Sequence, residues 1–448
     1  MSRLLRASAL AGATIPLAHP AFAATARPIS PGDTAWMLVC TALVLLMTIP
    51  GLALFYAGMV RKKNVLATMM QSFAICALIS VVWMLAGYSL AFGNGNGWIG
   101  DASRLFLNGL GASWDQAFVL GAGTAVAQPT AIPESVFVMF QMAFAVITPA
   151  VVTGAFADRM KFSALMIFMV LWSLLVYAPI AHWVWAPTGW LARLGVADFA
   201  GGTVVEINAG VSGLVCALVL GRRLGFGTEN MAPWNLTYAV TGGALLWVGW
   251  LGFNSGGAMG ANARAGMAVL ATQLAAAGAT LAWSGAEWLL RGKPSVLGAI
   301  SGAVAGLVAI TPAAGFVLPG PALAIGLIAG LVCFYAATEL KPRLRYDDSL
   351  DAFGVHGVGG IVGMLLTGVF AFGPLSTSAA DPVGAPGGAT GGLHLLGVQA
   401  VAVAAAIVWS AVGTYVALKI AGALVGLRVS REEEREGLDI ALHGEQVL

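Results

Sequence analysis

Apolar runs that are long enough to cross a lipid bilayer occupy most of this chain. A helix needs about 20 mainly apolar residues to span a hydrocarbon core that is about 30 Å thick. Eleven such runs can be recognised, at roughly residues 33–60, 64–92, 130–157, 162–185, 199–221, 233–254, 265–290, 295–312, 318–340, 351–372 and 393–427. The pattern predicts an all-α polytopic membrane protein with eleven transmembrane helices.

The composition excludes a soluble globular protein. The chain is 59% hydrophobic and only 9% charged, whereas soluble domains carry about 25% charged residues. All four cysteines lie in apolar runs, which is typical of small buried side chains and not of disulfides or metal ligands. No Gly-rich phosphate loop followed by Lys-Ser/Thr occurs in the sequence. We therefore expect no enzyme activity, no cofactor or metal, and no nucleic acid partner.

Basic residues orient the predicted spans. The connecting loops alternate between basic and nearly neutral, and the basic loops hold Arg61/Lys62/Lys63, Arg159/Lys161, Arg222/Arg223, Arg291/Lys293 and Lys341/Arg343/Arg345. Positively charged loops tend to stay in the cytoplasm. The pattern thus predicts a multi-pass protein of the plasma (inner) membrane, with its N-terminus outside and its C-terminus in the cytoplasm.

The N-terminus differs from the membrane domain, which we place at residues 33–427. Arg3 and Arg6 precede an apolar stretch that ends at Ala21-Phe22-Ala23. This arrangement makes residues 1–23 typical of a signal peptide. An additional N-terminal segment that is not cleaved is the alternative.

The C-terminal residues 428–448 form a charged tail, which we expect to be cytoplasmic and regulatory. The run Arg431-Glu-Glu-Glu-Arg435 is typical of a solvated helical turn with Arg/Glu pairs. A tail that only adds solubility is the alternative.

Two ionisable residues stand alone in glycine-rich apolar runs. Glu206 is the only one between residues 199 and 221, and His356 is the only one between residues 352 and 380. A charge at bilayer depth costs at least about 2.5–3.5 kcal/mol, so such residues usually face a pathway or a partner. We expect a role in permeation or proton handling; a buried pair that locks two helices together is the alternative.

A short motif repeats in opposite halves of the chain. Residues Gly51–Gly58 and Gly249–Gly256 both read GxxxFxxG near the end of an apolar run. Five spans separate the two copies, so the second copy has the opposite orientation. Inverted repeats of this kind are typical of transporters, with the substrate path between the halves. Glu206 and His356 lie in the last span of each half, and the repeat would bring them together.

The chain resembles the ammonium transporter family (Amt/Mep/Rh) from about Asp33 to the tail. The stretches that carry the resemblance are Pro50–Gly58, Asp198–Val205, Gly249–Asn254 and Asp351–Gly357. The resemblance implies a five-plus-five inverted repeat with one additional C-terminal helix, assembled as a homotrimer with a pore through each subunit. It also implies ammonium and methylammonium as substrates.

The resemblance assigns an external aromatic cage and a gate. The cage positions are Phe144 and Trp185, and Gly257 stands where the family commonly has a serine. Cation–π attraction suits a small cation that loses its water. The gate is a stacked pair, Phe144 with Phe253, and the residues lining the pore nearby are Phe55, Phe140, Trp250 and Thr311. Judged from the residues alone, ordinary aromatic packing would be the simpler explanation.

The resemblance also places Glu206 where most bacterial relatives have the first of two pore histidines, with His356 as the second. We expect the two residues to act as one coupled proton relay that accepts the proton of ammonium while ammonia crosses the pore. Asp198 and Asp351 precede the fifth and tenth spans, and we expect both to support the backbone at the start of these spans. Direct contact with the substrate is the alternative for Asp198.

Three functions remain open from the sequence. Ammonium transport is the leading hypothesis. An ammonium sensor that uses the transporter fold and a neutral ammonia channel of the Rhesus type are the alternatives. The tail resembles the regulatory tail of bacterial ammonium transporters, which implies a PII-type nitrogen regulatory protein as a partner at the cytoplasmic face.

Overall fold

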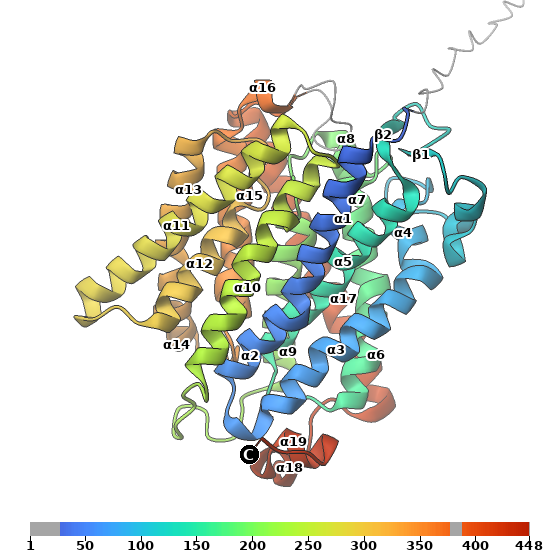
Figure 1. Ribbon diagram of the computed structural model, residues 1–448. Helices are drawn as coiled ribbons and strands as arrows, with labels where there is room; N and C mark the ends of the chain where they lie inside the picture. The colour runs from blue at the N-terminus through green and yellow to red at the C-terminus, as the bar shows by residue number, and fades with distance from the viewer. Residues whose placement is uncertain (1–26, 377–387, 448) are drawn as a thin grey trace, which may run out of the picture.

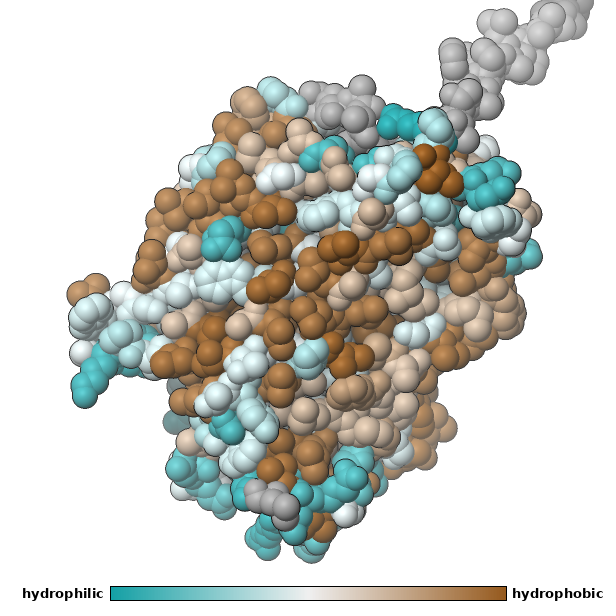
Figure 2. Space-filling view, viewed as in Figure 1, coloured by the Kyte–Doolittle hydropathy of each residue, from teal (hydrophilic) through white to brown (hydrophobic). Residues whose placement is uncertain are grey.

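The computed structural model describes residues 27–376 and 388–447, which form one bundle of long helices (Figure 1). The predicted signal peptide, residues 1–23, lies outside the described residues. Figure 2 shows apolar side chains across the flank of the bundle and hydrophilic ones gathered mainly toward its two ends. This distribution is the one expected of a protein whose flank contacts lipid.

The two ends of the bundle carry different structures. At the hairpin end, strand β1 (Ala117–Leu120) pairs antiparallel with β2 (Gln128–Pro133). At the tail end lie the two C-terminal helices, α18 (Arg431–Glu436) and α19 (Leu438–His443), as Figure 1 shows.

Two groups of five spans build the bundle, and α17 (Leu393–Val425) follows them. The first group contains α1 (Pro31–Leu46) with α2 (Ala53–Met59), α3 (Val65–Val82) with α4 (Tyr88–Phe92), α5 (Glu134–Val152), α6 (Phe162–Trp172) with α7 (Ala178–Trp185), and α9 (Asn208–Leu220). The second group contains α10 (Leu236–Ser255), α11 (Ala263–Arg291), α12 (Val296–Ile310), α13 (Pro319–Tyr335) with α14 (Lys341–Leu344), and α15 (Val358–Phe370). The short helices α8 (Trp190–Leu194) and α16 (Gly373–Ser376) lie in connections.

The prediction of eleven spans is confirmed. Within the described ranges, ten helical segments are long and apolar enough to cross a membrane, and α12 adds a shorter apolar helix of 15 residues. Pro312 follows just after the end of α12. Because proline cannot donate a backbone hydrogen bond, the helix ends inside the bundle instead of continuing to its surface.

The fifth and tenth spans each begin with a wide π-helical turn, Gly202–Ile207 before α9 and Phe353–Gly357 before α15. The first turn carries Glu206 and the second carries His356. The two spans can approach closely because they meet at glycine: a Cβ on Gly210 would lie only 2.1 Å from the backbone of the second turn. Small residues at helix crossings allow this kind of close packing.

The tail packs against the bundle, which differs from the solvated turn predicted from its charges. The Lys63 ammonium donates to the backbone carbonyls of Glu434 and Arg435, at 2.9 and 2.5 Å. The Asp439 carboxylate accepts from the backbone nitrogen of Ala67 at 2.8 Å. The Glu434 and Asp439 side chains are buried. The local charge pattern could not reveal this packing, because the contacting residues Lys63 and Ala67 lie more than 350 residues earlier in the chain.

Candidate functional site

Two phenylalanine rings stack at the contact between the two halves. Phe144 of α5 and Phe253 of α10 lie with ring centroids 4.2 Å apart and ring planes 31° from parallel. Each residue is only 1% exposed. Phe140 packs edge-on against Phe144, with centroids 4.9 Å apart. The stacked pair therefore fills the space between α5 and α10.

A small pocket of about 10 Å³ lies on the hairpin side of this pair. It is lined by Phe140, Gln141, Phe144, Trp185, Phe199, Ala200, Gly257 and Met259. Trp185, at the end of α7, stands at 89° to the Phe144 ring with centroids 5.7 Å apart. Its indole nitrogen donates to the carbonyl of Asp198 at 3.1 Å, which fixes the ring in place. The pocket thus brings together the three residues of the predicted cage.

Gly257 is tightly enclosed. A Cβ at this position would lie 2.7 Å from the carbonyl oxygen of Phe199 and 3.1 Å from its ring. Real Cβ atoms do not approach backbone oxygen this closely, so any larger residue would displace the chain around Phe199. The backbone around Gly257 therefore has no room for the serine that the family commonly has at this position.

Glu206 and His356 meet on the other side of the stacked rings. The Nδ1 atom of His356 lies 2.7 Å from Oε2 of Glu206. The other carboxylate oxygen, Oε1, is buried and has no hydrogen-bond partner among the described residues. The Trp250 ring lies nearly parallel to the His356 ring, with centroids 6.5 Å apart, and its indole nitrogen donates to the Thr311 hydroxyl at 2.8 Å.

A second pocket, of about 50 Å³, reaches the pair from the tail side. Its lining residues are Phe55, Tyr56, Met59, Trp283, Leu297, Ser301, Val304, Leu350, Asp351, Val355 and His356. His356 borders this pocket but Glu206 does not. From the hairpin end toward the tail end, the first pocket (the outer pocket), the stacked rings, the Glu206–His356 pair and the second pocket (the inner pocket) therefore follow one another. Tyr56 and Ser301 of this pocket are missing from the sequence prediction, because nothing in their apolar runs distinguishes them.

Asp198 holds the start of the fifth span. Its carboxylate accepts hydrogen bonds from the backbone nitrogens of Gly201, Gly202 and Thr203, at 2.9, 2.6 and 2.8 Å. The free amides at the start of the π turn are thereby satisfied. Asp198 acts on the backbone of the turn that carries Glu206.

The structure corrects the corresponding prediction for Asp351. Asp348 holds the tenth span, since its carboxylate accepts from the backbone nitrogens of Ala352 and Phe353 at 3.1 and 2.8 Å. These amides lie four and five residues after Asp348, which is the spacing that Asp198 also uses. Asp351 is too close to the turn to reach them and instead forms an ion pair with Lys341 while lining the inner pocket.

Within residues 27–376 and 388–447, no group of three or more His, Cys, Asp or Glu side chains is arranged to hold a metal ion.

Comparisons with known proteins give one family. The model of the Ammonium Transporter Family matches residues 35–448. The chain is 49% identical to the ammonium transporter of Bacillus subtilis (strain 168) over 93% of this chain and 98% of the relative. It is 47% identical to the ammonium transporter of Aquifex aeolicus (strain VF5), over 95% of each.

Solved structures agree with the sequence comparisons. The Saccharomyces cerevisiae Mep2 crystal structure superposes with a TM-score of 0.81 at 36% identity, covering 90% of this chain and 89% of that one. A structure described as a sensor Amt protein gives a TM-score of 0.81 at 29% identity, covering 92% of this chain and 98% of that one.

Proposed function

Because the chain belongs to the ammonium transporter family, we propose that its transport of ammonium runs through the outer pocket, the stacked rings, the Glu206–His356 pair and the inner pocket. The hairpin end faces outside and the tail end faces the cytoplasm, as the basic loops indicate. The observation that carries the proposal is the Glu206–His356 contact, because it leaves Oε1 of a buried carboxylate without a partner behind the stacked rings.

Recruitment takes place in the outer pocket. Phe144 and Trp185 line the pocket in which a cation sheds its water, and cation–π attraction to a ring face offsets part of the lost hydration. Gly257 supplies no hydroxyl to this pocket. Rotation of the Phe144 and Phe253 rings then opens the way inward, since the two rings occupy the space between the helices.

Deprotonation takes place at the pair. An ammonium ion that reaches the Oε1 atom of Glu206 transfers one proton to the carboxylate, which gives ammonia and a carboxylic acid. Ammonia moves on as a neutral molecule between Trp250, Thr311 and the inner pocket. Rotation of the carboxyl group brings this proton to the 2.7 Å contact, where Nδ1 of His356 accepts it, and the resulting imidazolium releases a proton into the pocket that His356 borders. Each cycle moves one ammonia and one proton, so the net transfer carries one positive charge.

A current measurement tests this mechanism. Proteoliposomes that contain the protein should give a current when ammonium is added, and methylammonium should compete. A neutral ammonia channel would change the internal pH without a current. A protein that only senses ammonium would give neither signal above empty liposomes, and either result would overturn the mechanism.

Assembly and partners complete the proposal. We expect a homotrimer, as the resemblance implies, and a PII-type protein that docks on the cytoplasmic end near α18 and α19. Size-exclusion chromatography with light scattering tests the trimer. Co-purification with a PII-type protein, compared between the full chain and a chain lacking residues 431–448, tests the docking.

A further inference from the structure

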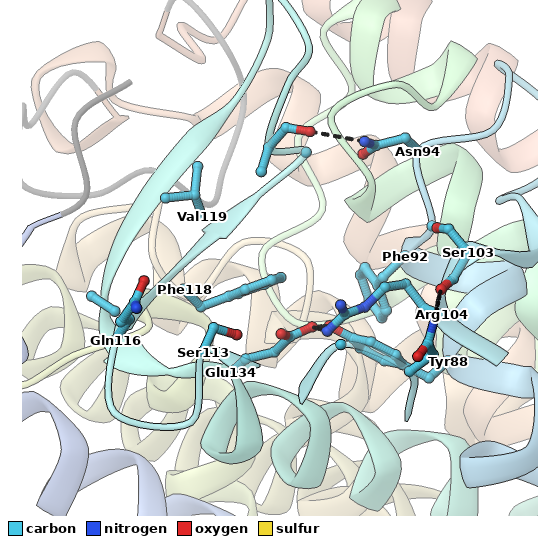
Figure 3. Close-up of a pocket in the computed structure, with 16 residues that line it drawn as sticks. Tyr88, Phe92, Asn94, Ser103, Arg104, Ser113, Gln116, Phe118, Val119 and Glu134 are labelled. Carbon is cyan, nitrogen blue, oxygen red and sulfur yellow. Dashed lines mark hydrogen bonds and ion pairs between the residues drawn. The ribbon is translucent and has the colours of Figure 1, made fainter. Parts of the chain in front are cut away.

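A cavity of about 470 Å³ opens at the hairpin end (Figure 3). It is separate from the proposed ammonium path. It lies between β1, the end of α4 and the turn at Ala102–Leu107. Among the described residues, none that lines it also lines the outer or inner pocket. Sites for small organic molecules have volumes of about 300–1,000 Å³, so this cavity has room for such a molecule.

An ion pair forms the floor of this cavity. The Arg104 guanidinium contacts the Glu134 carboxylate through Nη2 and Oε1, and the Tyr88 hydroxyl donates to the same oxygen at 2.8 Å. Glu134 is only 4% exposed and begins α5, whereas the Arg104 side chain remains 24% exposed. In the described part of the chain, the hydrogen bonds of this pair use one guanidinium nitrogen and one carboxylate oxygen.

The remaining atoms of the pair are available to a ligand. The Nη1 atom of Arg104 lies beside Gly109, where a Cβ would be 2.6 Å away, so glycine keeps this side of the guanidinium open. Figure 3 shows the ion pair in the lower part of the view, with Phe118, Ser113 and Gln116 on the side of Glu134.

Charge balance selects the class of ligand. Arg104 and Glu134 are the charged side chains among the described residues that line the cavity, so its charge sums to zero. A simple anion or cation would be attracted by one partner and repelled by the other at similar range. A molecule with both charges can satisfy both partners.

We propose that this cavity binds a small zwitterion, a free α-amino acid, on the outer face of the protein. The ligand carboxylate lies against Nη1 of Arg104, and its ammonium group lies against Oε2 of Glu134. An apolar part of the ligand packs on Phe118 and Phe92, which also line the cavity. Charge-assisted hydrogen bonds to groups already held in place make such a contact specific.

Direct binding tests the proposal. The full-length protein in lipid nanodiscs, in ammonium-free buffer, is titrated by calorimetry with glycine, alanine, leucine, phenylalanine and glutamine. At least one should bind at one site per chain. Its N-acetyl and methyl ester derivatives, which each lack one charge, should bind about tenfold more weakly or worse, since a hydrogen bond to a charged group is worth about 1.5–3 kcal/mol. No saturable binding by about 10 mM, or equal binding of the derivatives, overturns the proposal.

Two pairs of variants locate the site. Ser113→Trp fills the cavity and should abolish binding, whereas Asp115→Trp places the same ring two residues away, outside the lining, and should retain it. Gln116→Trp is the second filling variant, should the first fail to yield a monodisperse protein. Binding that survives the filling variants overturns the proposal.

The pore supplies a final control, because an amino acid also carries an ammonium group. Trp185→Leu removes the indole of the outer pocket and should leave amino acid binding unchanged. Loss of binding in this variant would assign the signal to the pore and overturn a separate site. The ammonium-evoked current of the same variants is measured separately in proteoliposomes, so a failure of transport and a failure of this site are distinguished.

Discussion

The Glu206 carboxylate meets the His356 ring across the contact between the two halves of the protein, with 2.7 Å between Oε2 and Nδ1. Each residue lies in a π-helical turn at the start of the last span of its half. A π turn places one additional residue in the helix, and such turns occur often at functional sites. Oε1 of the Glu206 carboxylate has no hydrogen-bond partner among the described residues.

We predict that Glu206→Gln abolishes the ammonium-evoked current while the protein folds normally. Glutamine keeps the size and the hydrogen bond to His356, but it cannot accept the proton of ammonium. The expected loss exceeds about a hundredfold, the lower end of what a positioned proton acceptor contributes. Proteoliposome electrophysiology measures the current, and size-exclusion chromatography checks the fold. Glu206→His should keep transport with a changed pH dependence.

The double variant tests whether Glu206 and His356 act together. His356→Gln should also lower the current, and combining it with Glu206→Gln should add little further loss, because one broken relay cannot be broken twice. Strictly additive effects would mean that the contact is structural packing.

Replacement of Gly257 by serine should weaken the outer pocket instead of restoring the common family residue. The new Cβ would lie 2.7 Å from the Phe199 carbonyl, so the chain around Phe199 must move. We expect a loss of about 1–3 kcal/mol in stability, as for other overpacked sites, and a half-saturation concentration that does not fall. Thermal unfolding and concentration-dependent currents provide the measurements.

Gly257→Ala is the matched control, since it adds the same Cβ without a hydroxyl. Equal effects of alanine and serine would support crowding. A lower half-saturation concentration in the serine variant alone would contradict this interpretation.

Sequence patterns predicted the spans and the paired ionisable residues well, because both depend on hydropathy and on charges that stand alone in apolar runs. The caps were harder to assign. Two aspartates, Asp348 and Asp351, precede the tenth span, and only the geometry of the turn decides which one reaches its amides. The crowding of Gly257 could not be read from the sequence either, since it depends on the Phe199 backbone from another span.

The two aspartates before the tenth span should respond differently to substitution. Asp348→Ala removes hydrogen bonds from two backbone amides, one buried and one partly buried, and should cost about 0.5–2 kcal/mol of stability, as for other helix caps. Asp351→Ala removes an ion pair whose carboxylate side chain is 36% exposed, and such pairs contribute about 0–1 kcal/mol. Thermal unfolding of the purified protein measures both variants. A larger loss for Asp351→Ala would reverse the assignment.

The tail should protect the loop between the first two spans from proteolysis. Lys63 is held by the carbonyls at the end of α18, and Leu438 donates its backbone nitrogen to Asn64 at 2.9 Å. Glu434 anchors this helix, since its carboxylate accepts from the backbone nitrogen of Leu224 and from the Arg428 guanidinium, both at 2.7 Å. Trypsin cleaves after lysine, so release of the tail exposes a site at this loop.

Glu434→Gln should therefore speed tryptic cleavage after Lys63 severalfold, while the membrane domain keeps its oligomeric state because the contacts among the spans themselves are unchanged. Glu432→Gln changes an exposed carboxylate on the same helix and should leave the cleavage rate unchanged. Deletion of residues 431–448 should give the fastest cleavage, with the same elution volume in size-exclusion chromatography. Mass spectrometry of timed digests identifies the cut. Equal rates for the two glutamine variants would mean that Glu434 does not anchor the tail, and a changed elution volume after the deletion would mean that the tail takes part in assembly.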